Sequence, residues 1–171
     1  MAENALTQAA IGFLTVVDEP AHGLFGGYLI LNPAGRPVEF HCTAPVKPNR
    51  AQEILYGTTL KPYLYGEQIA RALIEKSKIL PRVVCFDQAC AMCVRSIVSV
   101  PAILVEPAEG AASVPDSQIL WQKKQILSAL PDQPGDIPAV RKVLAELVIE
   151  FDFMEPFERI RSAISEAQKG I

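Results

Sequence analysis

The chain has 171 residues, half of them hydrophobic, so it is long enough to form one domain with its own core and is not a disordered chain. Its formal net charge of −3 excludes a strongly basic protein that coats nucleic acid non-specifically. Its apolar runs fall short of the roughly 20 residues that a membrane helix needs, and the first residues lack the pattern of a signal peptide. We therefore expect a cytoplasmic protein without membrane contact, whose four cysteines are reduced.

The first part of the chain predicts three strands. Residues 11–17 are apolar and β-branched, which is typical of a buried strand. A glycine-rich loop over residues 22–27 leads to a second strand over residues 28–32, and a third follows over residues 38–43. Because the turn at residues 32–35 is short, it joins the second and third strands as antiparallel neighbours.

The middle of the chain predicts helix. Asn49 has a glutamine three residues later, the spacing of a capping box, and this predicts a helix over residues 50–56. We expect Gly57 and Pro62 to interrupt it, with a second helical segment over residues 63–78.

A strand–helix–strand unit follows. Residues 83–86 and 102–106 are apolar strands, and the segment 88–97 between them is a short helix. Such a unit implies a parallel pair with a right-handed crossover.

The last third predicts helices after a linker over residues 107–115. They are expected from Asp116 or Ser117 to Leu130, carrying Trp121, and over residues 140–149 and 156–168.

The fold class is therefore α/β: a mixed five-stranded sheet, made of three antiparallel strands and a βαβ unit, with helices packed on it. We expect residues 1–106 to form this core, and residues 107–171 to add a linker and a C-terminal helical layer to the same domain.

Acidic residues occur at particular places in this order. Asp18 follows the first strand, Glu53 lies in the sequence Asn-Arg-Ala-Gln-Glu that begins the first helix, and Asp87-Gln88 ends the fourth strand. Glycines 23, 26 and 27 precede the second strand. Over residues 11–106 this arrangement resembles the ribonuclease H-like superfamily, in which the first strand carries an Asp, the first helix a Glu and the fourth strand a second Asp.

The resemblance implies a nuclease or other phosphodiesterase that depends on Mg²⁺ or Mn²⁺. Such enzymes use carboxylates that converge on two ions. By analogy Asp18, Glu53 and Asp87 would be the metal ligands and catalytic residues. A fourth acid would come from the C-terminal helices, where Asp152 is the first choice and Glu150 and Glu155 are alternatives.

The same acids also have ordinary structural interpretations. Asp18 precedes Glu-Pro and fits a turn, Glu53 in a first helical turn interacts favourably with the helix dipole, and Asp87 before a short helix is a normal N-cap. The alternative function is therefore a non-catalytic protein-interaction or assembly module with the same fold.

The cysteines allow three interpretations. Cys90 and Cys93 with Cys42 or His41 have ligand types for a zinc site that would stabilise such a module, and Cys85, Cys90 and Cys93 have the spacing of a plant-type iron–sulfur cluster. We favour structural cysteines, because free cysteine is often buried.

The middle third is the most basic part of the chain. Lys47, Arg50 and Lys61 indicate where a nucleic acid would bind, and a protein partner is the alternative. Three tyrosines near the expected helix break are candidates for a recognition surface, namely Tyr56, Tyr63 and Tyr65.

Overall fold

The computed structural model describes residues 10–147 and 150–170. These residues form one mixed sheet of seven strands in the order β3-β2-β1-β4-β5-β7-β6. The strands are β1 (Ile11–Glu19), β2 (Gly23–Leu31), β3 (Pro37–Cys42), β4 (Val83–Phe86), β5 (Ala102–Pro107), β6 (Gln118–Trp121) and β7 (Gln125–Ser128).

The strand directions follow the sequence prediction for the first five strands. β1, β2 and β3 are antiparallel neighbours, and β1, β4 and β5 run parallel to one another. The predicted count of five was wrong, because the hairpin of β6 and β7 extends the sheet beyond β5.

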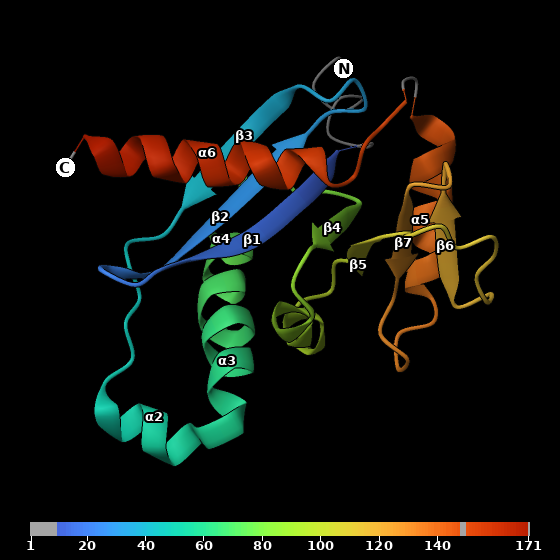
Figure 1. Cartoon of the computed structure of the whole chain (residues 1–171). Coiled ribbons are helices and arrows are strands. Elements are labelled where there is room, and N and C mark those ends of the chain that lie inside the picture. Colours follow the sequence, from blue (N-terminus) through green and yellow to red (C-terminus); the bar gives the residue numbers. More distant parts are fainter. Residues whose placement is uncertain (1–9, 148–149, 171) are drawn as a thin grey trace.

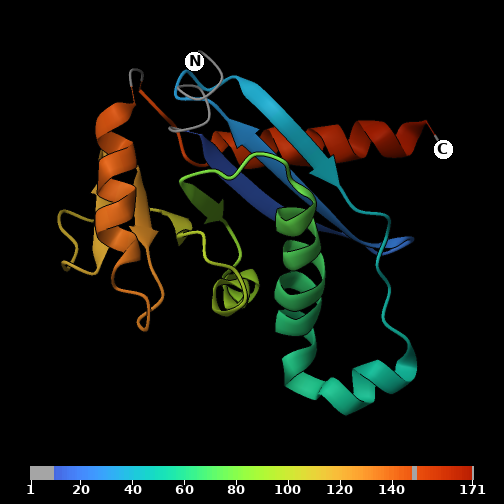
Figure 2. The same ribbon diagram turned by 180° about the vertical axis from the view of Figure 1, so that it is seen from behind.

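Helices cover both faces of the sheet (Figures 1 and 2). On one face α6 (Glu155–Lys169) lies across β1 and β2, and α5 (Asp136–Glu146) packs on β4 and β5. On the other face lies a helical arm that runs from Arg50 to Lys76, together with the 3₁₀ helix η3 (Ala89–Ser96). The arm consists of α2 (Arg50–Tyr56), η1 (Gly57–Thr59), α3 (Leu60–Pro62), the π-helical η2 (Tyr63–Ala70) and α4 (Arg71–Lys76).

The arm begins as the sequence predicts. The Asn49 side chain accepts a hydrogen bond from the Gln52 backbone N–H, and the Gln52 side chain accepts one from the Asn49 N–H, which completes the capping box. Gly57 ends α2 as expected, because its φ of 54° and ψ of −126° are not helical. Pro62 does not interrupt the helix as expected: helical turns continue from α3 through it, since the π-helical η2 absorbs the change in hydrogen bonding.

The helix predicted from residues 116 or 117 to Leu130 is wrong, because this segment is the β6–β7 hairpin. Two of its turn residues, Gln122 and Lys123, have φ of 48° and 59°. Side chains alternate between the two faces along each strand of the hairpin. Ile119 of β6 and Leu127 of β7 point inward, into the same hydrophobic cluster as α5 and α6. The Trp121 indole N–H donates to the Phe151 carbonyl at 2.7 Å, which fixes the hairpin to the segment before α6.

Two other elements differ from those expected. The segment at residues 88–97 is a 3₁₀ helix, and α5 begins earlier than predicted, with Pro138 in its first turn where no backbone N–H is needed. Positions 148 and 149 of that predicted helix lie outside the described residues. No helix in the described residues is long and apolar enough to cross a membrane.

The glycine-rich loop predicted over residues 22–27 is also wrong, because β2 already begins at Gly23. Gly26 and Gly27 are in the strand and face opposite sides of the sheet. A Cβ built on Gly26 would lie 2.2 Å from Ile69 of the arm, and one built on Gly27 would lie 2.2 Å from Ile160 of α6. Two consecutive glycines thus let a helix approach each face closely.

We expect Gly27→Ala to lower the free energy of unfolding by about 1–3 kcal/mol, because the added methyl group forces Ile160 and Ile164 to move. Urea denaturation measures this difference. Gly135→Ala is the control: its φ is −66° and an added Cβ meets no atom of the described residues within 4 Å, so we expect a change below about 0.5 kcal/mol. Equal effects of the two substitutions would contradict the close-approach interpretation.

Glu39 of β3 connects the sheet to the chain that follows α4. Its carboxylate accepts hydrogen bonds from the backbone N–H groups of Lys78 (2.9 Å) and Ile79 (3.0 Å), and it pairs with His41. Burial acts to raise the pKa of Glu39, but these hydrogen bonds outweigh it, so the pKa is lowered.

A lowered pKa means that Glu39 stabilises the fold above its ordinary value of about 4.3, and that this contribution is lost as the pH falls through the folded-state pKa. We expect Glu39→Gln to cost about 1–3 kcal/mol at neutral pH and less in acid. Urea denaturation over a pH series measures this, with the exposed Glu75→Gln as a near-neutral control. A difference that is constant across the series would refute it.

Candidate functional site

The carboxyl ends of β1 and β4 are the natural place to look for chemistry in a sheet of this kind. In the parallel register of these strands Leu14 is opposite Phe86, so one residue further along Thr15 is beside Asp87. The first-strand residue that neighbours Asp87 is therefore Thr15, whereas Asp18 lies three residues beyond it.

Asp18 and Asp87 lie on opposite faces of the sheet. Side chains alternate along a strand, so Thr15 is on the α6 face and Asp18 is on the arm face. Asp18 lines a groove beside the arm, and after burial its negative charge is the second cause that raises the pKa of Tyr65. Asp87 instead pairs with Arg161 of α6.

The Asp87 carboxylate is enclosed. Its side chain is only 5% exposed, and Oδ2 accepts a hydrogen bond from the Arg161 guanidinium. Within the described chain, Oδ1 and the neighbouring Thr15 hydroxyl are buried without a hydrogen-bond partner. The adjacent Gln88 side chain hydrogen-bonds to the N–H and carbonyl of Val16 at 2.9 and 2.8 Å, and so extends the β1–β4 pairing. Asp87 therefore faces an arginine and a buried polar cluster.

Glu53 does share a concavity with Asp18. Both line the same groove, although the Glu53 carboxylate also pairs with Arg50 at 3.2 Å. Asp152 is elsewhere: its Oδ1 accepts hydrogen bonds from the Gln125 side chain (2.8 Å) and the Met154 N–H (2.9 Å) at the start of α6.

The alternatives to Asp152 are at the same end of α6. Glu155 pairs with Arg159 at 2.6 Å, and Glu150 lines a small depression beside them. Asp152 and Glu155 therefore stabilise the local structure around the start of α6.

The structure does not bring the predicted carboxylates together. Among residues 10–147 and 150–170, no three His, Cys, Asp or Glu side chains are placed so that they could hold one ion. Hydrolysis by two metal ions needs ligands that converge on both ions. Asp18, Glu53, Asp87 and Asp152 do not meet this requirement, because the sheet separates Asp18 from Asp87 and Arg161 already neutralises Asp87.

The cysteines of the predicted zinc and iron–sulfur sites lie in different parts of the structure. Cys42 lines a depression on the α6 face, whereas Cys90 and Cys93 lie on η3 against the arm. Cys85 is fully buried in β4, and burial raises the pKa of its thiol well above the ordinary value. His41 is paired with Glu39. The proposed zinc and iron–sulfur ligand sets therefore do not come together in the described residues.

We call the concavity beside the helical arm the arm groove. Its volume is about 480 Å³, which is within the usual range for ligand pockets. Its walls are largely apolar, and the Lys61 ammonium lies 5.4 Å from the centre of the Tyr65 ring. Charged side chains of both signs line it: Asp18, Glu19, Glu53, Lys47 and Lys61.

The end of the arm exposes apolar side chains. Ile54 and Leu55 of α2 are 64% and 83% exposed, and among the described residues α2 has no buried member. The rings of Tyr56 and Tyr63 stack with centroids 4.4 Å apart at the adjoining corner. We call Ile54 and Leu55 the arm tip. This exposed surface was not predicted from the sequence. A signal was present, because in a short amphipathic helix adjacent residues point in different directions, so two adjacent aliphatic side chains cannot both lie at the centre of one buried stripe.

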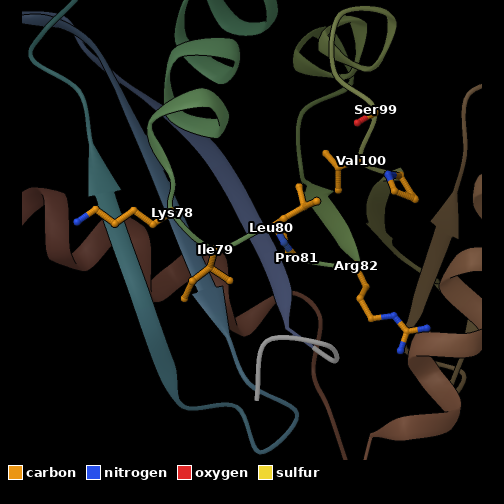
Figure 3. Close-up of a pocket in the computed structure, with 8 residues that line it drawn as sticks. Lys78, Ile79, Leu80, Pro81, Arg82, Ser99 and Val100 are labelled. Carbon is orange, nitrogen blue, oxygen red and sulfur yellow. The ribbon is translucent and has the colours of Figure 1, made fainter. Parts of the chain in front are cut away.

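A second groove, of about 770 Å³, lies at the opposite end of the parallel strands (Figure 3). It is lined by residues 78–82 and 99–101, which precede β4 and β5. Arg82 points toward α5, where it pairs with Glu146 at 2.6 Å, and Leu80 is 71% exposed. This groove contains none of the predicted acids and lies at the amino ends of the strands, so the arm groove is the better candidate site.

The order of the first five strands, with helices on both faces, defines a ribonuclease H-like fold. Solved structures of similar fold include two of endonuclease V from Ciona intestinalis. One is in complex with a 23mer DNA containing an inosine followed by a ribo-adenosine, with a TM-score of 0.53, 12% identity, and coverage of 93% of this chain and 86% of that chain. The other contains a 24mer DNA of the same description, with a TM-score of 0.52, 12% identity, and coverage of 92% and 87%.

At this level of identity the similarity shows the fold alone, and it confirms the predicted resemblance at the level of the fold. No protein-family model matches the sequence, and no curated protein matches it significantly.

We expect Arg161→Ala to lower the free energy of unfolding by about 1–3 kcal/mol, because it leaves the buried Asp87 carboxylate without its cation. Adding Asp87→Asn should recover part of this loss, which a double-mutant cycle measured by urea denaturation would show as a coupling energy. Arg71→Ala, which removes an exposed arginine from an ion pair of 2.9 Å, is the control and should change stability little. Strict additivity of the two substitutions would show that the pair is not coupled.

Proposed function

We propose that this chain is a non-hydrolytic interaction module built on a ribonuclease H-like fold, and that it binds a partner protein through the arm tip. The observation that carries the first part is the placement of Asp18 and Asp87 on opposite faces of the sheet, with Asp87 enclosed by Arg161. A divalent cation that approached Asp87 would meet the like charge of the guanidinium. We also propose a cytoplasmic location, which free thiols support.

The exposed apolar surface supports a protein partner. Scattered apolar residues are normal on a protein surface. Ile54 and Leu55 are different, because they are adjacent and α2 has no buried residue, so folding removes little of their apolar surface from water. Burying them contributes about 25 cal/mol per Å² of apolar surface. A partner that covers the arm tip would provide this burial.

The charges around the arm groove favour a protein over a nucleic acid. Lys47 and Lys61 share the groove with three carboxylates, and Arg50 pairs with one of these, Glu53. A phosphate backbone needs a continuous basic surface, and here acids interrupt it. The DNA in the two endonuclease V structures supports a nucleic-acid partner as the alternative.

Metal-dependent phosphodiester hydrolysis with Mg²⁺ or Mn²⁺ is the second candidate function, and the endonuclease V-like fold is the observation that favours it. Incubation with labelled DNA containing inosine, and with RNA, in the presence of Mn²⁺ tests it. We expect no cleavage by the wild type. Cleavage that Asp87→Asn abolishes without unfolding the protein would overturn the non-hydrolytic proposal, whereas cleavage that survives this substitution would indicate a contaminant.

The arm tip is tested by placing a photo-crosslinking amino acid at Leu55 and, as a matched control, at Leu80 in the full chain. Both side chains are exposed, 83% and 71%, but they lie on different parts of the molecule. We expect irradiation of living cells to give a discrete adduct of higher mass from position 55 only, and Ile54→Asp to abolish it. Adducts of equal yield from both positions, or from neither, would refute the assignment.

A further inference from the structure

The cysteines of η3 are neighbours on one side of a 3₁₀ helix. Cys90 and Cys93 are three residues apart, and side chains at this spacing eclipse in a helix with three residues per turn. The rise of about 2.0 Å per residue places their Cα atoms about 6 Å apart, which is within the usual range for a disulfide. Both residues are half-buried and therefore open to small reagents.

The two thiols have different surroundings. The single S–H of Cys93 can be shared between the carbonyls of Pro62 (3.3 Å) and Cys90 (3.4 Å), and the thiol fills the space that a side chain at position 66 would occupy. A Cβ built on Gly66 would lie 2.2 Å from its Sγ. Cys93 is thus packed on the helical arm.

The charges nearest these thiols differ in sign. Burial raises the pKa of both thiols, the cation of Lys61 opposes this rise at Cys90, and Glu67 adds to it at Cys93. Since the thiolate is the attacking species, Cys90 is the better first nucleophile, and the reaction should accelerate as the pH rises.

We propose that Cys90 and Cys93 form a thiol–disulfide exchange site for low-molecular-weight disulfides of the glutathione class. The Cys90 thiolate attacks one sulfur of the small disulfide, breaks its S–S bond and releases one small thiolate, which leaves a mixed disulfide on Cys90. The Cys93 thiolate then attacks the Cys90 sulfur and releases the second small thiolate. The protein loses two electrons and two protons, and the small disulfide is reduced to two thiols.

Closing this bond would change a contact of the arm. Oxidised Cys93 has no hydrogen to donate to the Pro62 carbonyl, and its Sγ must turn from Gly66 toward Cys90. The site therefore couples the redox state of η3 to the packing of the arm. This proposal does not depend on the partner-binding function.

The full chain carrying Cys42→Ser, which removes the exposed cysteine, is incubated with glutathione disulfide at mildly alkaline pH and followed by intact-protein mass spectrometry. We expect the mass to fall by two hydrogen atoms, and peptide mapping to link Cys90 to Cys93. In the same background, Cys93→Ser should retain one glutathionyl group on Cys90, and Cys90→Ser should react much more slowly.

Stable glutathionylation without loss of two hydrogens in the Cys42→Ser chain would overturn the proposal. So would a lack of reaction in that chain under conditions that oxidise its urea-unfolded form, or equal adducts in the two single-cysteine variants. Thermal melts establish that each variant is folded, and Cys93→Ala replaces Cys93→Ser if the serine hydroxyl destabilises the contact with Gly66.

Discussion

The close approach of two helical layers to β2 is the constraint on which the rest of this structure depends. Gly26 and Gly27 present only hydrogen to the arm on one face and to α6 on the other. Protein interiors are close-packed, so a methyl group at Gly26 would force Ile69 to move, and one at Gly27 would force Ile160 to move. The position of α6 brings Arg161 over Asp87, and the position of the arm places Asp18 and Glu53 on one groove. A backbone feature of one strand thus determines what each candidate residue can contact.

Much of the fold could be predicted from local patterns. Apolar runs, a capping box and helical spacing identified the first five strands, α2 and α6, because each of these signals acts over a few residues. The β6–β7 hairpin was missed for a physical reason. Gln122 and Lys123 adopt the left-handed conformation without being glycine or asparagine, so the turn has no chemical marker, and the flanking Gln-Ile-Leu segments are compatible with helix as well as with strand.

The candidate site was less accessible to sequence reasoning. Asp87 was correctly placed after β4, but its partner Arg161 is 74 residues away, and no local pattern connects the two. The placement of Asp18 and Asp87 on opposite faces could have been predicted in part. Because alternate residues of a strand face opposite ways, an acid three positions beyond Thr15 must be on the other face, and the register of β1 with β4 decides which residue neighbours Asp87. The spacing of the acids along the chain identified the strands and helices that carry them, but not the face of the sheet on which each side chain lies.

The corner of the helical arm at Gly57 has a consequence for how this surface can change. Gly57 adopts φ of 54°, and a Cβ there would meet no atom of the described residues within 4 Å. The backbone conformation of Gly57, together with the stacked rings of Tyr56 and Tyr63 at this corner, therefore sets the direction in which the arm tip points. A substitution at this corner would redirect α2 while leaving the core intact. Because residues other than glycine are strained at this φ, such a substitution carries a cost in backbone energy, and glycine at this corner is what keeps the exposed helix in its present orientation.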